Sequence, residues 1–301
     1  MEKQIFWITS YPKSGNTLLR YMLIALFFTN DGKFKFDISK YISQFDQAII
    51  VKKNKKIFGE DYNKIGNINT FYKYIVKLQS KEILGFKNDF IFLKTHAGLF
   101  KIDDNPFTTI HNTRGFIYIV RDPRDVCISN AKHNGMSYDE SIKIMLNDSA
   151  YIEWIQKKED IEFLSNKLVP KSLMSSWEKH FLSWTLVDWK IPFLVLKYED
   201  LVYEKKEKIK KIILFFEKNY NFNFKNTEQK ISNIIKTTEF NVFKKYEENK
   251  GFAEASVNSK FFSVGQKDQW RKKLSINQIK TIENKFKKTM KSLKYKLSVE
   301  V

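Results

Sequence analysis

Cysteine is almost absent from this sequence, whose 301 residues contain only Cys127. A lone thiol excludes a disulfide within the chain, and with it the disulfide-rich secreted classes, and it fits a reducing compartment. Proline is also scarce, with five residues, and the sequence has neither a glycine- or serine-rich linker nor an internal repeat. We therefore expect one globular domain spanning residues 1–301.

Long apolar runs are missing as well. The longest strongly apolar run, residues 18–28, contains Arg20 and is too short to span a bilayer. The amino terminus does not have the layout of a signal peptide, because one lysine is followed at once by a predicted strand. Hydrophobic residues make up 43% of the chain, enough to bury a substantial core. We expect a soluble, cytoplasmic protein with no transmembrane segment.

Basic residues outnumber acidic ones by 53 to 34, which gives a net charge of +19. Because a basic surface attracts polyanions, a non-catalytic nucleic-acid-binding protein is one alternative. The lysines, however, are spread along the whole chain, a pattern typical of solvated helix faces. Only five basic residues are arginine, and three of them lie within residues 114–124. The guanidinium group suits phosphate geometry, so this cluster indicates an anion site.

Strand and helix patterns alternate along the chain, which predicts an α/β protein with a central parallel β-sheet flanked by helices on both faces. Short apolar runs predict strands at residues 4–10, 89–95, 115–120 and 193–197. Apolar or amphipathic runs predict five helices. The first spans residues 17–29, the second begins at Pro123, and the third runs from the Ser175–Glu178 segment to about Trp189. The last two span residues 205–220 and 276–293. The spacing of Ser175 and Glu178 predicts a capping box before the third of these helices, and Ser275 is the expected cap of the last.

Two stretches, residues 30–88 and 135–171, match no core strand strongly. In an open α/β sheet, such insertions usually lie over the carboxyl ends of the strands, where ligands bind. We expect both stretches to form lids over an acceptor-binding site.

One turn has the clearest signal for ligand binding. The sequence SYPKSGNT, residues 10–17, lies between the first predicted strand and the first predicted helix. Backbone N–H groups at the helix start, the helix dipole and the Lys13 ammonium converge there, and the hydroxyls of Ser14 and Thr17 add donors. A phosphate-like ligand is the expected guest. The alternative is an ordinary strand–helix turn with a surface lysine, because short phosphate-loop patterns often mislead.

This turn is not a Walker A loop. That motif places its lysine after a second glycine, whereas Lys13 precedes Gly15, the only glycine of the turn. Among strand-end aspartates only Asp122 stands out as a residue that could serve a magnesium ion. A nucleotide or small-molecule kinase of related fold is therefore a weaker alternative.

Two motifs resemble one known family. YPKSGNT, residues 11–17, resembles the 5′-phosphosulfate loop of sulfotransferases that use 3′-phosphoadenosine-5′-phosphosulfate (PAPS), whose usual form is YPKSGTT. YIVRDPRDVCIS, residues 118–129, is similar to their second signature, which holds the 3′-phosphate. Further similar segments are LKTH at 93–96, SWEKHFLSW at 176–184, LKYEDL at 196–201 and TEF at 238–240. The sequence is thus identified as a member of the cytosolic or bacterial PAPS-dependent sulfotransferases, over about residues 4–285.

The resemblance implies a P-loop-like sulfotransferase fold and a transferase activity. A sulfuryl group would pass from PAPS to an acceptor hydroxyl or amine by in-line displacement, leaving 3′-phosphoadenosine-5′-phosphate (PAP), with no metal required. His96 would be the general base, Lys13 would stabilise charge on the leaving group, and Lys94 would act around the transferred group. The residues implied in nucleotide binding are Lys13, Ser14, Gly15, Asn16, Thr17, Arg121, Ser129, Tyr198, Thr238, Phe240, Ser263 and Gly265.

The sequence departs from the family pattern in several places. Leu18 stands where many relatives have a tryptophan that stacks on adenine. In the carboxyl-terminal signature, usually RKGxxGDWK, Ser263 and Val264 replace the arginine and lysine that contact the 3′-phosphate. We expect weaker donor binding rather than a different donor. The family's dimer signature has Lys280 at its acidic end, so that dimer is not predicted and the oligomeric state stays open.

The acceptor class is not fixed by the sequence. Lysine-rich lids would suit an anionic glycan, whereas the aromatic residues between 34 and 100 would suit a phenol or a lipid alcohol. We therefore expect a small-molecule, lipid or glycan acceptor, and no specific nucleic acid.

Overall fold

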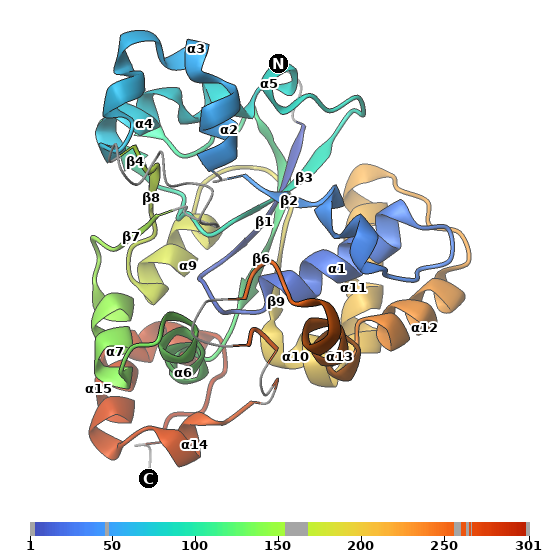
Figure 1. The fold of residues 1–301 in the computed structure, drawn as a ribbon. Coiled ribbons are helices and arrows are strands. Elements are labelled where there is room, and N and C mark those ends of the chain that lie inside the picture. The colour runs from blue at the N-terminus through green and yellow to red at the C-terminus, as the bar shows by residue number, and fades with distance from the viewer. Residues whose placement is uncertain are drawn as a thin grey trace. The chain divides into compact units, whose positions relative to one another are not determined.

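The structure is a computed structural model that describes residues 4–45, 48–153, 168–255, 260–262, 265 and 267–298. Five parallel strands form a central sheet in the order β2-β3-β1-β6-β9, flanked by helices (Figure 1). The strands are β1 (Ile5–Ser10), β2 (Ser43–Gln44), β3 (Ile91–Thr95), β6 (Thr113–Val120) and β9 (Phe193–Lys197). The predicted α/β class with a central parallel sheet is confirmed.

The register of the sheet follows its apolar strands. β1 pairs in parallel with β3, from Ile5 opposite Ile91 to Thr9 opposite Thr95. All six residues of β1 are buried, as expected for a parallel strand that is covered on both faces. β2 pairs with the other edge of β3 and lies inside the stretch 30–88. Its two polar residues, Ser43 and Gln44, carry no strand signal, so the sequence did not reveal it.

The chain folds into two compact units, each assembled from separate segments. The first comprises Met1–Tyr11, Ile42–Tyr118 and Asp148–Leu194, and the second Pro12–Tyr41, Ile119–Asn147 and Val195–Val301, within the described residues. Because the chain passes between the units several times, they are not successive domains along the sequence. The single domain over residues 1–301 stays a prediction.

The first unit contains β1, β2, β3 and most of β6, together with short helices and hairpins. Its helices are α2 (Ala48–Lys53), α3 (Lys55–Phe58), α4 (Ile68–Ile75), α5 (Lys81–Leu84) and α9 (Trp177–Thr185), with 3-10 turns η2 (Gly59–Lys64) and η3 (Lys77–Gln79). Antiparallel pairs join β4 (Lys101–Ile102) to β5 (Asn105–Pro106) and β7 (Tyr151–Glu153) to β8 (Lys171–Leu173). Trp7 lies at the centre of an aromatic core, with ring centroids 5.3 Å from Phe107 and 6.5 Å from Trp184.

Helix α9 differs from its prediction at both ends. Its cap is Ser176, whose side chain accepts a hydrogen bond from the Lys179 N–H, and not the predicted Ser175. Ser175 has a left-handed backbone, with φ 65°, and donates its hydroxyl to the Asp148 carbonyl oxygen over 2.8 Å. Because a helix cap takes an extended conformation, Ser175 cannot serve as one. The helix ends at Thr185, four residues before the predicted end at Trp189.

The second unit is mostly helical. Its elements are α1 (Asn16–Phe28), η1 (Phe36–Tyr41), α6 (Pro123–Asn134), α7 (Tyr138–Leu146), α10 (Tyr198–Tyr203), α11 (Lys205–Tyr220), α12 (Thr227–Thr237), α13 (Phe240–Lys250), α14 (Trp270–Lys273) and α15 (Ile276–Ser292). α6 packs against α7 and both contact α15, while α12 packs against α1 and α11 (Figure 1). Pro123 opens α6, and Ser275 caps α15 with a capping box, as predicted. Cys127 is buried on α6, where burial raises the pKa of its thiol to about 11.

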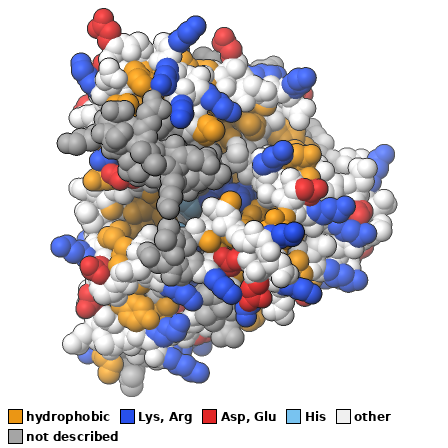
Figure 2. All heavy atoms as spheres, viewed as in Figure 1, with side chains coloured by type: hydrophobic (Ala, Val, Ile, Leu, Met, Phe, Trp, Pro, Cys, Tyr) orange, Lys and Arg blue, Asp and Glu red, His pale blue; other side chains and the backbone are white. Residues whose placement is uncertain are grey.

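The distribution of charged side chains on the surface agrees with the prediction that the lysines lie on solvated helix faces. Lysine and arginine side chains are spread over much of the face drawn in Figure 2, with acidic side chains between them. Among the helices of the described ranges, none has the length and apolar content needed to cross a membrane.

Candidate active site

The turn before α1 has an unusual backbone. Lys13 and Gly15 both adopt left-handed conformations, with φ 66° and 97°. The cap position of α1 is Gly15, which has no side chain to accept the first N–H groups of the helix. A Cβ atom on Gly15 would lie 2.3 Å from Cδ2 of Tyr198, so only glycine lets this ring approach the turn. The start of α1 therefore presents N–H groups and the positive end of the helix dipole.

Several buried polar atoms near this turn have no hydrogen-bond partner among the described residues, namely the Tyr11 hydroxyl, Arg20 Nε, Ser14 Oγ and Arg121 Nε. Ser14 is fully buried, and its Oγ makes no such bond. Arg121 is 6% exposed, and its Nε has no acceptor in the same part of the chain. Buried polar groups are nearly always paired, so unpaired ones point to a missing ligand. Since Arg121 is cationic and Ser14 Oγ and Arg121 Nε both belong to donor groups, an anion is a ligand that could supply acceptors to both.

Arg121 brings the two predicted nucleotide motifs together. Its Nη1 donates a hydrogen bond to the Lys13 carbonyl oxygen over 3.1 Å. Its guanidinium lies 4.4 Å from the ring centroid of Tyr198. The Lys13 ammonium lies 4.2 Å from the ring centroid of Phe261, which sequence reasoning had not singled out. The structure therefore brings Lys13, Ser14, Gly15, Arg121 and Tyr198 together, and their role as one nucleotide site stays a prediction.

Thr17 already has an acceptor for its hydroxyl. It donates to Oε2 of Glu254 over 2.9 Å, and Arg20 pairs with the same carboxylate. Burial alone would lower the pKa of Arg20, but the nearby Glu254 carboxylate raises it, so the guanidinium stays charged. Glu254 was not predicted as a site residue. The only sequence signal was Arg20, a charged residue within an apolar helix that needs a partner when buried.

The other predicted nucleotide residues are distributed around the second unit. Asn16 is buried in the first turn of α1, and Ser129 is half-buried on α6. Thr238 is fully buried, and its hydroxyl donates to the Ile234 carbonyl oxygen over 2.6 Å.

Phe240 and Gly265 lie close to each other. Phe240 opens α13, and a Cβ atom on Gly265 would lie 2.5 Å from its ring. Ser263, predicted to contact the 3′-phosphate, lies outside the described residues.

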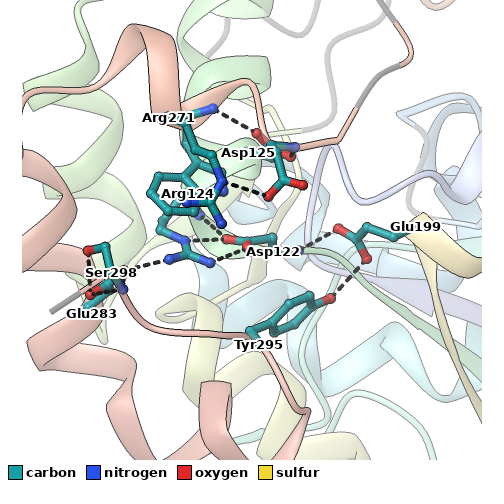
Figure 3. A network of polar contacts seen from close by, with 10 residues as sticks. Asp122, Arg124, Asp125, Glu199, Arg271, Glu283, Tyr295 and Ser298 are labelled. Atoms are coloured by element: carbon teal, nitrogen blue, oxygen red, sulfur yellow. Dashed lines mark hydrogen bonds and ion pairs between the residues drawn. The ribbon is translucent and has the colours of Figure 1, made fainter. Parts of the chain in front are cut away.

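The arginine cluster of the sequence serves three different purposes. Arg114, in the first unit, lies over the rings of Phe6 and Phe90. Arg124 is 2% exposed and pairs with Asp122 at 2.6 Å and with Glu283 at 2.5 Å (Figure 3). Arg124 is therefore committed to carboxylates within the protein, and the anion site expected from the cluster stays a prediction for Arg121.

Asp125 attaches the carboxyl-terminal signature to α6. Its two carboxylate oxygens accept hydrogen bonds from the backbone N–H groups of Asp268, at 2.8 Å, and Trp270, at 3.2 Å. Burial raises the pKa of Asp125, and Arg121 lowers it. The contact holds Asp268 and Trp270 of this signature against the helix that follows Arg121, even though the basic residues of the family signature are replaced.

His96, in the first unit, follows directly after β3. Its Nδ1 lies 2.8 Å from the carbonyl oxygen of Ser10. A carbonyl oxygen can only accept a hydrogen bond, so Nδ1 carries the proton of the neutral ring, and we assign the lone pair to Nε2. Lys94, two residues earlier on β3, is 4% exposed.

His180 supports His96 from α9. Its Nε2 lies 3.0 Å from the His96 carbonyl oxygen, and its Nδ1 lies 2.7 Å from the hydroxyl of Tyr118. Burial lowers the pKa of His180 to about 4, so the ring is neutral at physiological pH. The sequence had no local signal for this contact with His96, because the two residues lie 84 positions apart.

Residues 3–294 match the family model of the sulfotransferase domain. The chain belongs to the sulfotransferase family. This match confirms the predicted family and the predicted enzyme class.

Solved structures resemble this sulfotransferase over nearly its whole length. Retinol dehydratase in complex with androsterone and inactive cofactor PAP has a TM-score of 0.58 at 20% identity, covering 97% of this chain and 82% of that one. Retinol dehydratase in a complex with retinol and PAP gives 0.58 at 19% identity, with the same coverage. Mouse sulfotransferase SULT7A1 complexed with PAP gives 0.59 at 18%, covering 96% and 86%. At these identities the similarity concerns the fold, and the predicted sulfotransferase fold is confirmed.

Proposed function

We propose that this sulfotransferase moves the sulfuryl group of PAPS to a hydroxyl or amine of a small-molecule, lipid or glycan acceptor, leaving PAP. The observation that carries the proposal is the pair of buried, unpaired donor atoms, Ser14 Oγ and Arg121 Nε, among the described residues around the α1 turn. A ligand with two separate phosphate groups would give both atoms acceptors. PAP in the mouse SULT7A1 and retinol dehydratase structures supports this choice of nucleotide.

The residues of the second unit fit such a nucleotide chemically. The α1 N-terminus, Lys13 and Ser14 offer positive charge and donors for the 5′ group, and Arg121 offers a guanidinium for the 3′-phosphate. The aromatic rings of Tyr198 and Phe240 would suit the flat faces of an adenine. When bound, PAPS supplies the activated sulfuryl group.

His96 is the proposed general base. With Nδ1–H held by the Ser10 carbonyl oxygen, Nε2 is the nitrogen that would accept the proton of the acceptor hydroxyl or amine. The same carbonyl oxygen would stabilise the imidazolium that results, because its dipole faces the charged ring. Lys13 and Lys94 would lower the energy of negative charge that develops during transfer.

The proposal extends to the acceptor class, the cellular location of the protein and the acceptor-binding lids. Neighbouring structures with androsterone and retinol support a small apolar alcohol as the acceptor. We propose that residues 30–88 and the described part of 135–171 contribute to acceptor binding. A buried thiol at Cys127 supports a reducing, cytoplasmic location.

Calorimetric titration tests the donor site first. The wild-type chain should bind PAP at least about tenfold more tightly than adenosine 5′-monophosphate (AMP), which lacks the 3′-phosphate, because a charge-assisted bond to Arg121 is lost. Equal affinities, or no binding of PAP, would rule out the proposed site. A screen with labelled PAPS against phenols, steroids, lipid alcohols and glycans would then identify the acceptor class.

A further inference from the structure

We infer that Glu199 and Tyr295 are positioning residues that set the 3′-phosphate specificity of Arg121. This inference rests on the proposed function, since it assumes that Arg121 binds the 3′-phosphate. All the residues involved lie in the second unit. Figure 3 shows Glu199 and Tyr295 beside Asp122.

Glu199 holds the backbone next to Arg121. Its Oε1 accepts a hydrogen bond from the Asp122 N–H over 3.0 Å, and its Oε2 accepts one from the Tyr295 hydroxyl over 3.1 Å (Figure 3). The carboxylate therefore has one oxygen on the turn and the other on the carboxyl-terminal segment. Tyr295 fixes the rotation of the carboxylate, and the carboxylate fixes the turn.

The other side of the turn is held in a similar way. Both oxygens of Asp122 accept hydrogen bonds from Arg124: Oδ1 from the backbone N–H and Nε, each at 2.9 Å, and Oδ2 from Nη2 at 2.6 Å. Arg124 also donates to Glu283, and the Ser298 N–H and hydroxyl donate to that same carboxylate at 2.9 to 3.1 Å. Residues 295–298 thus hold both of the acids, Glu199 and Glu283, that contact the turn.

Arg121 itself is held by weaker contacts than its neighbours. Its guanidinium makes one hydrogen bond to the Lys13 carbonyl oxygen and stacks on Tyr198, while its Nε has no acceptor in the described part of the chain. Tyr198 directly precedes Glu199 in the sequence, so a shift of Glu199 would move the stacking ring as well as the Asp122 backbone. The orientation of the Arg121 guanidinium therefore depends on Glu199 in two ways, through the Asp122 backbone and through the Tyr198 ring.

The tests are Tyr295→Phe, Glu199→Ala and Glu199→Gln, with Tyr41→Phe as the control. Tyr41 is an exposed tyrosine of the same unit. Calorimetry would give the Kd of each variant for PAP and for AMP, and thermal melting would report folding. We expect Tyr295→Phe to raise the Kd for PAP about fivefold and Glu199→Ala to raise it about tenfold or more. The Kd for AMP should change less than about twofold in both variants. Glu199→Gln keeps an acceptor for the Asp122 N–H and should restore PAP binding to within about threefold of wild type.

The outcomes separate this inference from the proposed function. If wild type does not prefer PAP to AMP, the proposed function fails and the inference fails with it. If wild type does prefer PAP, but Tyr295→Phe keeps the wild-type ratio of the two Kd values, the inference alone is overturned. An equal loss for both nucleotides would also overturn it, because that result indicates a general structural role. If Glu199→Ala does not fold, Tyr295→Phe still decides the question.

Discussion

The Arg121 guanidinium donates a hydrogen bond to the backbone carbonyl oxygen of Lys13 over 3.1 Å, although 108 positions separate the two residues. This bond joins the turn before α1 to the turn before α6. A carbonyl oxygen holds the guanidinium without cancelling its charge, as a carboxylate would. The hydrogen bond of Arg121 thus goes to a neutral acceptor, whereas Arg124, three residues later, pairs with the carboxylates of Asp122 and Glu283.

Arg121→Ala should weaken PAP binding by roughly 10- to 100-fold, because a charge-assisted hydrogen bond with the 3′-phosphate is lost. The affinity for AMP should fall less than about threefold, since AMP has no 3′-phosphate. Calorimetric Kd values for the two nucleotides would measure both effects. Arg271→Ala is the control, as Arg271 is exposed and pairs with Asp268. Equal weakening of PAP and AMP by Arg121→Ala would contradict the assignment.

His96→Ala should lower the rate of sulfuryl transfer by about 10² to 10⁴-fold, because the general base is removed. Its affinity for PAP should stay within about twofold of wild type, since His96 is proposed to act on the acceptor and not on the nucleotide. Turnover with labelled PAPS and calorimetry with PAP would measure the two quantities. Near-wild-type turnover would show that another group takes the proton.

His180 should make the folded state sensitive to acid. Burial lowers the pKa of its imidazole in the folded chain to about 4 from 6.5, its ordinary value. Between these two pH values the unfolded chain binds the proton and the folded chain does not, so stability falls as the pH falls below 6.5. Between pH 7 and pH 5 this residue should lower the free energy of unfolding by about 2 kcal/mol.

Denaturant unfolding of His180→Gln at both pH values provides the measurement for that prediction. The variant should lose about 2 kcal/mol of the difference between pH 7 and pH 5, even if it is less stable throughout. His111→Gln is the matched control, because His111 is an exposed histidine. An unchanged pH dependence in His180→Gln would show that folding does not lower the pKa of His180.

The pair of Arg20 and Glu254 should be energetically coupled. Arg20→Met and Glu254→Gln should each lower the free energy of unfolding by about 2 kcal/mol, because each leaves a largely buried partner without its counterpart. The double variant should cost less than the sum of the two single variants, by about 1 to 2 kcal/mol. Urea unfolding of all four proteins completes the cycle. Strictly additive effects would mean that the ion pair contributes no net stability.

Local sequence signals correctly predicted the first and last residues of some elements. β9 and α11 begin and end where the apolar run and the amphipathic run begin and end, at Phe193–Lys197 and Lys205–Tyr220. The cap at Ser275 was also found, because a capping serine and its partner lie three residues apart. The cap of α9 was missed by one residue, since the choice between Ser175 and Ser176 depends on a contact with Asp148 that has no local signature.

The sequence by itself determined the family, four of the five strands of the central sheet (β1, β3, β6 and β9), and the two turns that hold Lys13 and Arg121. These features depend on residue types at short spacing, which leave a readable pattern. Only the tertiary structure decided that Glu254 meets Thr17, 237 positions away, and that Glu199 holds Asp122, 77 positions away. Hydrogen bonds between such distant residues require the chain to be folded, because no local propensity selects one carboxylate over another.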